Sequence, residues 1–282
     1  MEQIKKLFQA TDMTVGEPWK QIVQFTVPML IGNIAQQLYN TVDSIVVGQY
    51  VGDNALAAVG SAAPILNLLL VLFIGISMGG SIMVAQYFGA KQREELSYTV
   101  GNCILLTAIA TGIIMLLSVV LIRPLLVMLN TPASIIDWCY SYLMIMFLGF
   151  VGCAYYNILS GVLRGLGDAF SALVYLLVST VLNIILDLLF VAKLGMGVSG
   201  VAWATIIAQA VSAVLCFIRM AKLTDIFDLK LHYMKYNKKF SGKIIKLGLP
   251  SGLTQAIFSM AMIVVQSLTN SFGEMFISAN VI

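Results

Sequence analysis

The stretch Phe170–Val191, F-S-A-L-V-Y-L-L-V-S-T-V-L-N-I-I-L-D-L-L-F-V, is long enough as a helix to cross a hydrocarbon core of ~30 Å. Asn183 and Asp187 are four residues apart and Thr180 is three residues earlier, so a helix places all three on one face. An ionisable side chain at that depth is unfavourable by roughly 3 kcal/mol unless it faces a cavity, an ion or a partner. The stretch therefore predicts a membrane-spanning helix that carries an oxygen-lined cation or proton site. The alternative is an aspartate at the end of the span that reaches water.

The composition of the whole chain agrees with a membrane protein. Of 282 residues, 60% are hydrophobic and 10% are charged, whereas a soluble domain has about 25% charged residues. We therefore predict an all-α polytopic membrane protein. The net charge of +3 comes from basic residues spread over loops, which does not indicate a nucleic-acid partner, and no cofactor is expected. The cysteines lie in apolar runs without metal-ligand spacing and are expected to be small buried residues: Cys103, Cys139, Cys153 and Cys216.

Seven apolar runs are expected to cross the membrane, and an eighth begins near the end of the sequence. The second run is too long for a straight crossing, and Pro64 is expected to kink or break it. Gly161 and Gly165, at the end of the fourth run, are expected to allow close helix packing. The runs are Ile22–Val47, Ala55–Gln86, Leu96–Leu121, Ile135–Leu163, Phe170–Val191, Val198–Met220 and Leu247–Thr269.

The basic residues predict which side of the membrane each connection faces. With the N-terminus in the cytoplasm, fourteen of the sixteen lysines and arginines are cytoplasmic, and only Arg123 and Lys193 lie outside. The positive-inside rule therefore predicts a cytoplasmic N-terminus and six spans before the basic interval Ala221–Lys246. The protein is expected in the cell membrane.

After the basic interval the sequence resembles its own beginning. Lys243–Pro250 is similar to Lys20–Pro28, and Asn270–Ala279 is similar to Gly48–Ala58, although apolar helices also show such similarity by chance. Both copies would enter from the same side, as in transporters built from parallel repeats. The chain would then have a truncated second half. The expected domains are a six-helix N-lobe over residues 1–220, a cytoplasmic inter-lobe loop over 221–246, and the first one to two helices of a C-lobe over 247–282.

The first span carries a stripe of polar side chains at three- and four-residue steps: Asn33, Gln36, Gln37, Asn40, Asp43 and Ser44. Such a stripe is unfavourable against lipid, so it should face a bundle interior or water. Pro28 removes a backbone hydrogen bond one turn before the stripe and is a candidate hinge. Spans four and six add Tyr142, Asn157, Thr205 and Gln209. Each of these is individually expected to make an interhelical hydrogen bond, but together with two acids they indicate cation chemistry.

Three separated motifs occur in the order of one transporter family. Pro28–Gly48, P-M-L-I-G-N-I-A-Q-Q-L-Y-N-T-V-D-S-I-V-V-G, followed by A-L-A-A-V-G, resembles the first two spans of the multidrug and toxic compound extrusion (MATE) transporters. Gly161–Ala169, G-V-L-R-G-L-G-D-A, is similar to their connection between spans four and five. Asn183 and Asp187, with Thr205 eighteen residues further on, resemble their N-lobe cation site.

The resemblance implies twelve spans in two six-span lobes, with drugs and other organic cations exported by alternating access against an inward sodium or proton gradient. It places Asp43, Asn183, Asp187 and Thr205 at the cation site, with Na⁺ as one candidate ion. The residues implied to line the substrate cavity are Gln36, Asn40, Tyr142 and Asn157. One branch of the family also has a glutamate early in span seven. Ser251–Met262 contains no acid, so a C-lobe site of that type is not expected.

Two other functions fit parts of the sequence. Gly165, Gly167 and Asp168 match the G-x-G-D pattern of intramembrane aspartyl proteases, with Asp43 or Asp187 as the second acid, although a helix cap is the competing interpretation of Asp168. A lipid or lipid-linked-sugar flippase of related architecture would line its cavity with basic residues, and none lies near the middle of a span. We therefore predict a monomeric exporter and not an enzyme. Its expected partners are a drug or organic cation, a coupling H⁺ or Na⁺, and the lipid bilayer.

Overall fold

A computed structural model describes residues 16–281, and this part of the chain is helical without strands. The predicted all-α class is therefore confirmed. Residues 1–15, which include the basic residues Lys5 and Lys6, and Ile282 lie outside the described range. The helices are α2 (Pro18–Tyr50), α3 (Asp53–Gly89), α4 (Arg93–Met128), α5 (Ile136–Leu148), α6 (Phe150–Gly165), α7 (Ala169–Asp187), the π-helix η1 (Leu188–Lys193), α8 (Gly197–Ala221), α9 (Lys238–Asn270) and α10 (Glu274–Val281).

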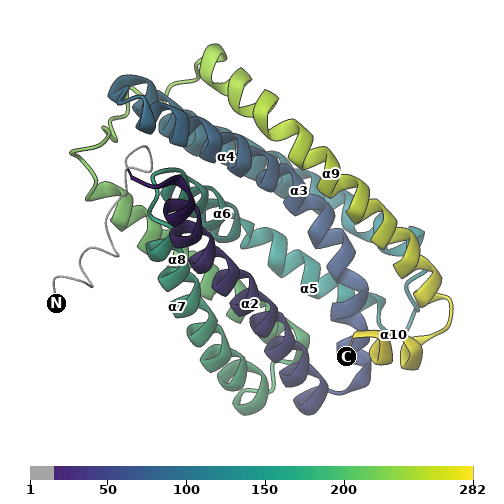
Figure 1. The fold of residues 1–282 in the computed structure, drawn as a ribbon. Coiled ribbons are helices and arrows are strands. Elements are labelled where there is room, and N and C mark those ends of the chain that lie inside the picture. The colour runs from purple at the N-terminus through teal and green to yellow at the C-terminus, as the bar shows by residue number, and fades with distance from the viewer. Residues whose placement is uncertain (1–15, 282) are drawn as a thin grey trace.

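The long helices run alternately between two ends of one bundle (Figure 1). We call the end with connections 90–92, 166–168 and 222–237 the basic end, and the opposite end, with connections 51–52, 129–135, 194–196 and 271–273, the far end. Helix α3 is central, because it packs against α4, α6 and α9. Helix α2 packs on α7, and α6 packs on α8. Two segments far apart in the sequence, α2 and α7, thus lie side by side and bring their polar faces together.

The lengths and composition of the helices agree with a multi-pass membrane protein. Within residues 16–281, five helices are long and apolar enough to cross a membrane, or six if the bent pair α5 and α6 counts as one span. These are fewer than the seven complete spans expected from the sequence. The expected first span, Ile22–Val47 in α2, is not among them. Helix α2 has ample length, so the polar stripe that carries Asp43 is what lowers its hydropathy.

The break in a long apolar run falls in the fourth span and not in the second. Pro64 was expected to kink or break the second run; it lies inside α3, which continues from Asp53 to Gly89, so of these two outcomes the break does not occur. Instead, α5 and α6 meet at Gly149 with a bend of 53°. Phe147 and Phe150 flank that glycine, and the ring centroid of Phe150 lies 5.1 Å from that of Phe73 on α3. The bend therefore allows aromatic side chains on both of its sides to pack into the core beside α3.

Three glycines allow helices to approach closely. A Cβ atom on Gly165 would lie 2.6 Å from the backbone oxygen of Ser81 on α3, and one on Gly161 would collide with Ser77. The predicted packing role of Gly161 and Gly165 is therefore confirmed. The same kind of contact joins α3 to α9, because a Cβ on Gly79 would collide with the carbonyl oxygen of Ile244.

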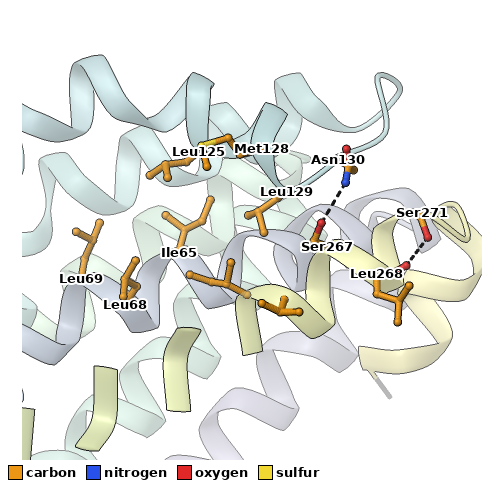
Figure 2. Close-up of a pocket in the computed structure, with 12 residues that line it drawn as sticks. Ile65, Leu68, Leu69, Leu125, Met128, Leu129, Asn130, Ser267, Leu268 and Ser271 are labelled. Carbon is orange, nitrogen blue, oxygen red and sulfur yellow. Dashed lines mark hydrogen bonds between the residues drawn. The ribbon is translucent and has the colours of Figure 1, made fainter. Parts of the chain in front are cut away.

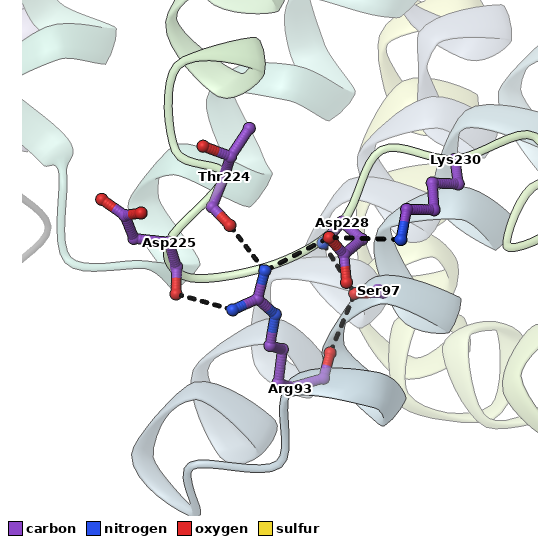
Figure 3. A network of polar contacts seen from close by, with 6 residues as sticks. All are labelled: Arg93, Ser97, Thr224, Asp225, Asp228 and Lys230. Carbon is purple, nitrogen blue, oxygen red and sulfur yellow. Dashed lines mark hydrogen bonds and ion pairs between the residues drawn. The ribbon is translucent and has the colours of Figure 1, made fainter.

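The basic interval is shorter than expected and is attached to α4. Helix α9 begins at Lys238, so residues 238–246, expected in the loop, are helical. The remaining segment 222–237 lies over the first turns of α4 (Figure 3). Arg93 donates to the carbonyl oxygens of Thr224 at 2.6 Å and Asp225 at 3.3 Å, and it pairs with Asp228 at 3.2 Å. This ordered route places the first turn of α9 beside α4.

The first turn of α9 is held by one buried side chain of α4. Asn102 Oδ1 accepts hydrogen bonds from the backbone N–H of Asn237 at 2.9 Å and from the Ser241 hydroxyl at 2.8 Å. At the far end, α9 encloses a cavity of about 500 Å³ with α3 and α4 (Figure 2). Asn130 Nδ2 donates across this cavity's rim to Ser267 Oγ at 3.1 Å. The last residue of α9, Asn270, is buried, and its Nδ2 donates to the carbonyl oxygen of Leu129 at 2.8 Å, so α9 is held at both ends with the cavity beside the second contact.

Candidate cation site

The two aspartates of the predicted site meet where α2 packs on α7. Asp43 lies two turns before the end of α2, and Asp187 is the last residue of α7. The side-chain amide of Asn183 lies between their carboxylates. In the side-chain orientation that satisfies the hydrogen-bonding capacity of the Asn183 amide, its Nδ2 donates to Asp43 Oδ1 at 2.8 Å and to Asp187 Oδ2 at 3.2 Å. The structure thus brings together three of the four predicted site residues around one bridging amide.

The fourth residue, Thr205, reaches the same place from α8 and faces Asp43. Asn183 and Asp187 are fully buried, and Thr205 is buried as well. Asp187 Oδ1 and Thr205 Oγ1 have no hydrogen-bond partner among the described residues. A buried oxygen without a partner is unfavourable, so these atoms mark the place where a ligand would be stabilised.

This arrangement fits a proton or a small hard cation. Two carboxylates held by one amide repel each other unless a proton or a cation neutralises part of their charge. The available ligands are carboxylate and hydroxyl oxygens, which hard cations prefer over nitrogen or sulfur. Among the described residues, no three His, Cys, Asp or Glu side chains gather at one point. The donor set therefore suits H⁺ or a monovalent ion such as Na⁺ better than a transition metal.

Asp187 also marks a change in the backbone, because the π-helix η1 follows it directly. A π-helix forms i→i+5 hydrogen bonds and is frequently found at functional sites. The sequence around residues 188–193 is a continuation of an apolar run with no proline or glycine, and carries no signal for this change. The expected span Phe170–Val191 is therefore an α-helix only as far as Asp187.

Two tyrosines complete the surroundings of the acid pair. Tyr142, a predicted cavity residue, is buried and close enough to Asp43 and Asp187 to interact with them electrostatically. Tyr39 has the same two neighbours, and its buried hydroxyl has no hydrogen-bond partner among the described residues. Sequence reasoning missed Tyr39, although it lies four residues before Asp43 and therefore on the same helical face.

The other predicted cavity residues lie nearer the basic end. Pro28, Gln36 and Asn157 line one cavity of about 300 Å³ between α2, α6 and α7. Asn157 Nδ2 donates to the backbone oxygen of Cys153 at 2.8 Å, which is a local helical contact. Asn40 is exposed and does not line this cavity. The structure therefore separates the predicted residues into an acid cluster and a distinct cavity along the same helix.

Asp168 is far from the acid cluster. Its Oδ1 accepts a hydrogen bond from the backbone N–H of Ser171 at 3.1 Å and so caps the start of α7, whereas Asp187 ends that helix. Its Oδ2 pairs with Nε of Arg219 at 2.9 Å. The 19 residues of α7 place the two aspartates roughly 27 Å apart along the helix. Asp168 therefore cannot form a catalytic dyad with Asp187, and the helix-cap interpretation is confirmed.

The sequence profile of the MatE family matches residues 28–189, which contain Asp43, Asn183 and Asp187. The chain belongs to the MatE family. This MatE chain is 30% identical over 263 residues to the "Probable multidrug resistance protein YoeA" of Bacillus subtilis, which covers 91% of the chain and 57% of YoeA. The predicted resemblance to MATE transporters is confirmed.

Two solved structures resemble the MatE chain in fold. One is described as the inward-facing conformation of a multidrug resistance MATE family transporter, with a TM-score of 0.84 and 28% identity over 93% of this chain and 60% of that one. The other is described as the outward-facing conformation of such a transporter, with a TM-score of 0.83 and 30% identity over 92% of this chain and 58% of that one. The MatE chain thus spans 57% to 60% of the length of these three relatives. They are named for multidrug resistance or transport, and not as enzymes.

Proposed function

We propose that the protein is a cation-coupled antiporter that exports drugs or organic cations across the cell membrane by alternating access. The observation that carries this proposal is the Asn183 amide bridging Asp43 and Asp187. An acid pair of which Asp187 is buried and Asp43 is partly buried, with unsatisfied oxygens beside it, binds or releases H⁺ or Na⁺ as its surroundings change. The names of the relatives support a small organic substrate.

Coupling requires that the ion and the drug favour different conformations. A ligand shifts a conformational equilibrium only through its differential affinity for the two states. The described part of the chain superposes almost equally well on an inward-facing and an outward-facing relative. This similarity supports a mechanism in which residues 1–220, as the proposed N-lobe, move largely as a unit against a second lobe.

Drug transport in proteoliposomes tests the proposal directly. The protein is reconstituted, and efflux of a fluorescent organic cation is recorded under a sodium gradient alone, a proton gradient alone, and no gradient. We expect one of the two gradients to stimulate efflux. Equal efflux under all three conditions would contradict ion coupling, whereas no transport of any cation would contradict the proposed substrate class.

Pro28→Ala tests whether the first long helix acts as a hinge. Pro28 lies inside α2, 15 residues before Asp43, and lines the cavity shared by α2, α6 and α7. Alanine restores a backbone hydrogen bond and stiffens the helix. We expect drug binding in this variant to lose most of its dependence on pH or sodium, measured by fluorescence titration. Pro64→Ala, in the interior of α3, is the matched control and should keep the parent's dependence. If Pro28→Ala also keeps it, the hinge is rejected.

The proposed orientation places the N-terminus and the basic end in the cytoplasm. Single cysteines at Asn54, near the far end, and at Leu231, in the segment 222–237, are expected to react with an impermeant thiol reagent from opposite sides of the membrane. Both positions are exposed, and Leu231 has 84% of its surface accessible. The native cysteines are replaced by alanine beforehand. Labelling of both positions from the same side would contradict the topology.

A further inference from the structure

The cavity between α2, α6 and α7 contains an arginine that the transport proposal does not use. Arg164 lies in the last turn of α6 and lines this cavity of about 300 Å³ near the basic end of the bundle. Its side chain is largely buried and makes no hydrogen bond or ion pair with any described residue. Its electrostatic neighbours, Tyr156 and Cys216, are uncharged when protonated.

Three acids at the basic end are paired with other cations, and none of the ion pairs among the described residues includes Arg164. Asp168, four residues after Arg164, is fully buried and pairs with Arg219. Asp228 pairs with Arg93, and Glu17 pairs with Lys20. A guanidinium that is withdrawn from water without an acid is unfavourable, and its planar donors suit phosphate or carboxylate oxygens. The local excess of positive charge at Arg164 therefore favours an anionic ligand.

The remaining walls of the cavity show what else such a ligand contains. Besides Arg164, the lining includes the polar side chains of Asn33, Gln36 and Ser160. The rest of the lining is mainly apolar and comes chiefly from α2 and α7: Met29, Gly32, Ala172, Leu173 and Leu176. A free inorganic ion would leave these apolar side chains without a partner, whereas a molecule with an anionic head and an alkyl part would contact both surfaces.

We propose that Arg164 binds the phosphate group of an anionic amphiphile, whose alkyl part occupies the apolar half of the cavity between α2, α6 and α7. This site lies at the opposite end of α7 from the Asp43–Asp187 pair. Binding at this site is measured without any ion gradient, so its test does not depend on the proposed transport function.

The test measures binding to the purified full chain in a maltoside detergent by microscale thermophoresis. The probes are dihexanoyl phosphatidic acid, dihexanoyl phosphatidylcholine and inorganic phosphate. We expect phosphatidic acid to bind at least about tenfold more tightly than phosphatidylcholine, and Arg164→Gln to weaken its binding by about tenfold or more. Lys222→Gln removes a charge at the exposed cap of α8, also at the basic end, and should leave binding within about twofold of the parent.

A second variant keeps the test decisive if Arg164→Gln does not fold. Ala172→Leu fills the apolar half of the cavity and leaves Arg164 in place, so phosphatidic acid should bind more weakly while inorganic phosphate is unaffected. Unchanged phosphatidic acid binding in either variant would overturn the proposal. An equal loss of phosphatidic acid binding in Lys222→Gln would also overturn the proposal, because it would show that any basic residue at this surface contributes to binding. If inorganic phosphate binds as tightly as phosphatidic acid, the site binds a free ion, and the proposal of an amphiphilic ligand is rejected.

Discussion

Asp43→Asn and Asp187→Asn are each expected to reduce gradient-driven efflux to the level of empty liposomes while the protein still inserts into the membrane. Each substitution removes one of the two carboxylates that the Asn183 amide bridges, and an amide binds neither H⁺ nor Na⁺ as a carboxylate does. Membrane insertion should survive because asparagine has nearly the same shape and is less unfavourable in the membrane than a charged acid. Efflux in proteoliposomes and size-exclusion chromatography of the purified variants give the two measurements.

The control for this pair is an acid at the far end that does not belong to the cluster. Asp137, in the first turn of α5, is exposed, and Asp137→Asn should transport at the parent's rate.

Asn183→Leu adds a test of the bridge itself, because it keeps both acids but removes the amide between them. We expect this variant to bind drug and to lose its response to the coupling ion. Normal coupled efflux with Asp43→Asn and Asp187→Asn combined would reject the site.

Asp168→Ala is expected to give the largest loss of stability among the substitutions considered. The Asp168 side chain has no accessible surface, and its Arg219 partner is 18% exposed. Removing one member of a buried ion pair destabilises a protein by about 3–5 kcal/mol, because the remaining charge loses its partner. The loss of the helix cap at α7 adds roughly 1 kcal/mol. Thermal denaturation in detergent, followed by tryptophan fluorescence, should show a clearly lower midpoint for this variant.

Asp168→Asn separates these two contributions. Asparagine is as good a helix cap as aspartate, but it carries no charge for Arg219. We therefore expect Asp168→Asn to be destabilised less than Asp168→Ala, by the share that belongs to the cap. Asp225→Ala, which removes an exposed carboxylate from the segment 222–237, should denature close to the parent's midpoint. A midpoint for Asp168→Ala equal to that of the parent would show that the buried pair does not stabilise the fold.

Much of the fold follows from local sequence patterns. The apolar runs predicted most helices, because hydrophobic length and periodicity depend only on neighbouring residues. The bridge between Asp43 and Asn183 was harder to predict from the sequence. It depends on the packing of α2 against α7, and these two residues are more than a hundred positions apart in the chain. The resemblance to a known family supplied that contact, while the sequence alone supplied two separate polar faces.

The features that were missed depend on tertiary packing. Pro64 looked like the natural break, yet α3 accommodates it, and the chain bends at Gly149, where Phe147 and Phe150 pack beside α3. The change to a π-helix after Asp187 leaves no mark in an apolar sequence. Arg164 was not singled out from the sequence, because only the structure shows that the nearby Asp168 pairs with Arg219. At Gly149 and at Arg164 distant side chains, and not local propensity, decide the outcome.

Helix α9 is anchored to the bundle at both of its ends. Asn102 holds its first turn. At its last residue, Asn270 Nδ2 donates to the carbonyl oxygen of Leu129 at 2.8 Å, and Asn270 Oδ1 accepts from the Ser61 hydroxyl at 3.1 Å. The helix has 33 residues and is therefore roughly 50 Å long. The cavity between α3, α4 and α9 lies beside the second anchor, so α9 can close or widen this cavity by a swing of its end only if the buried hydrogen bonds of Asn270 break.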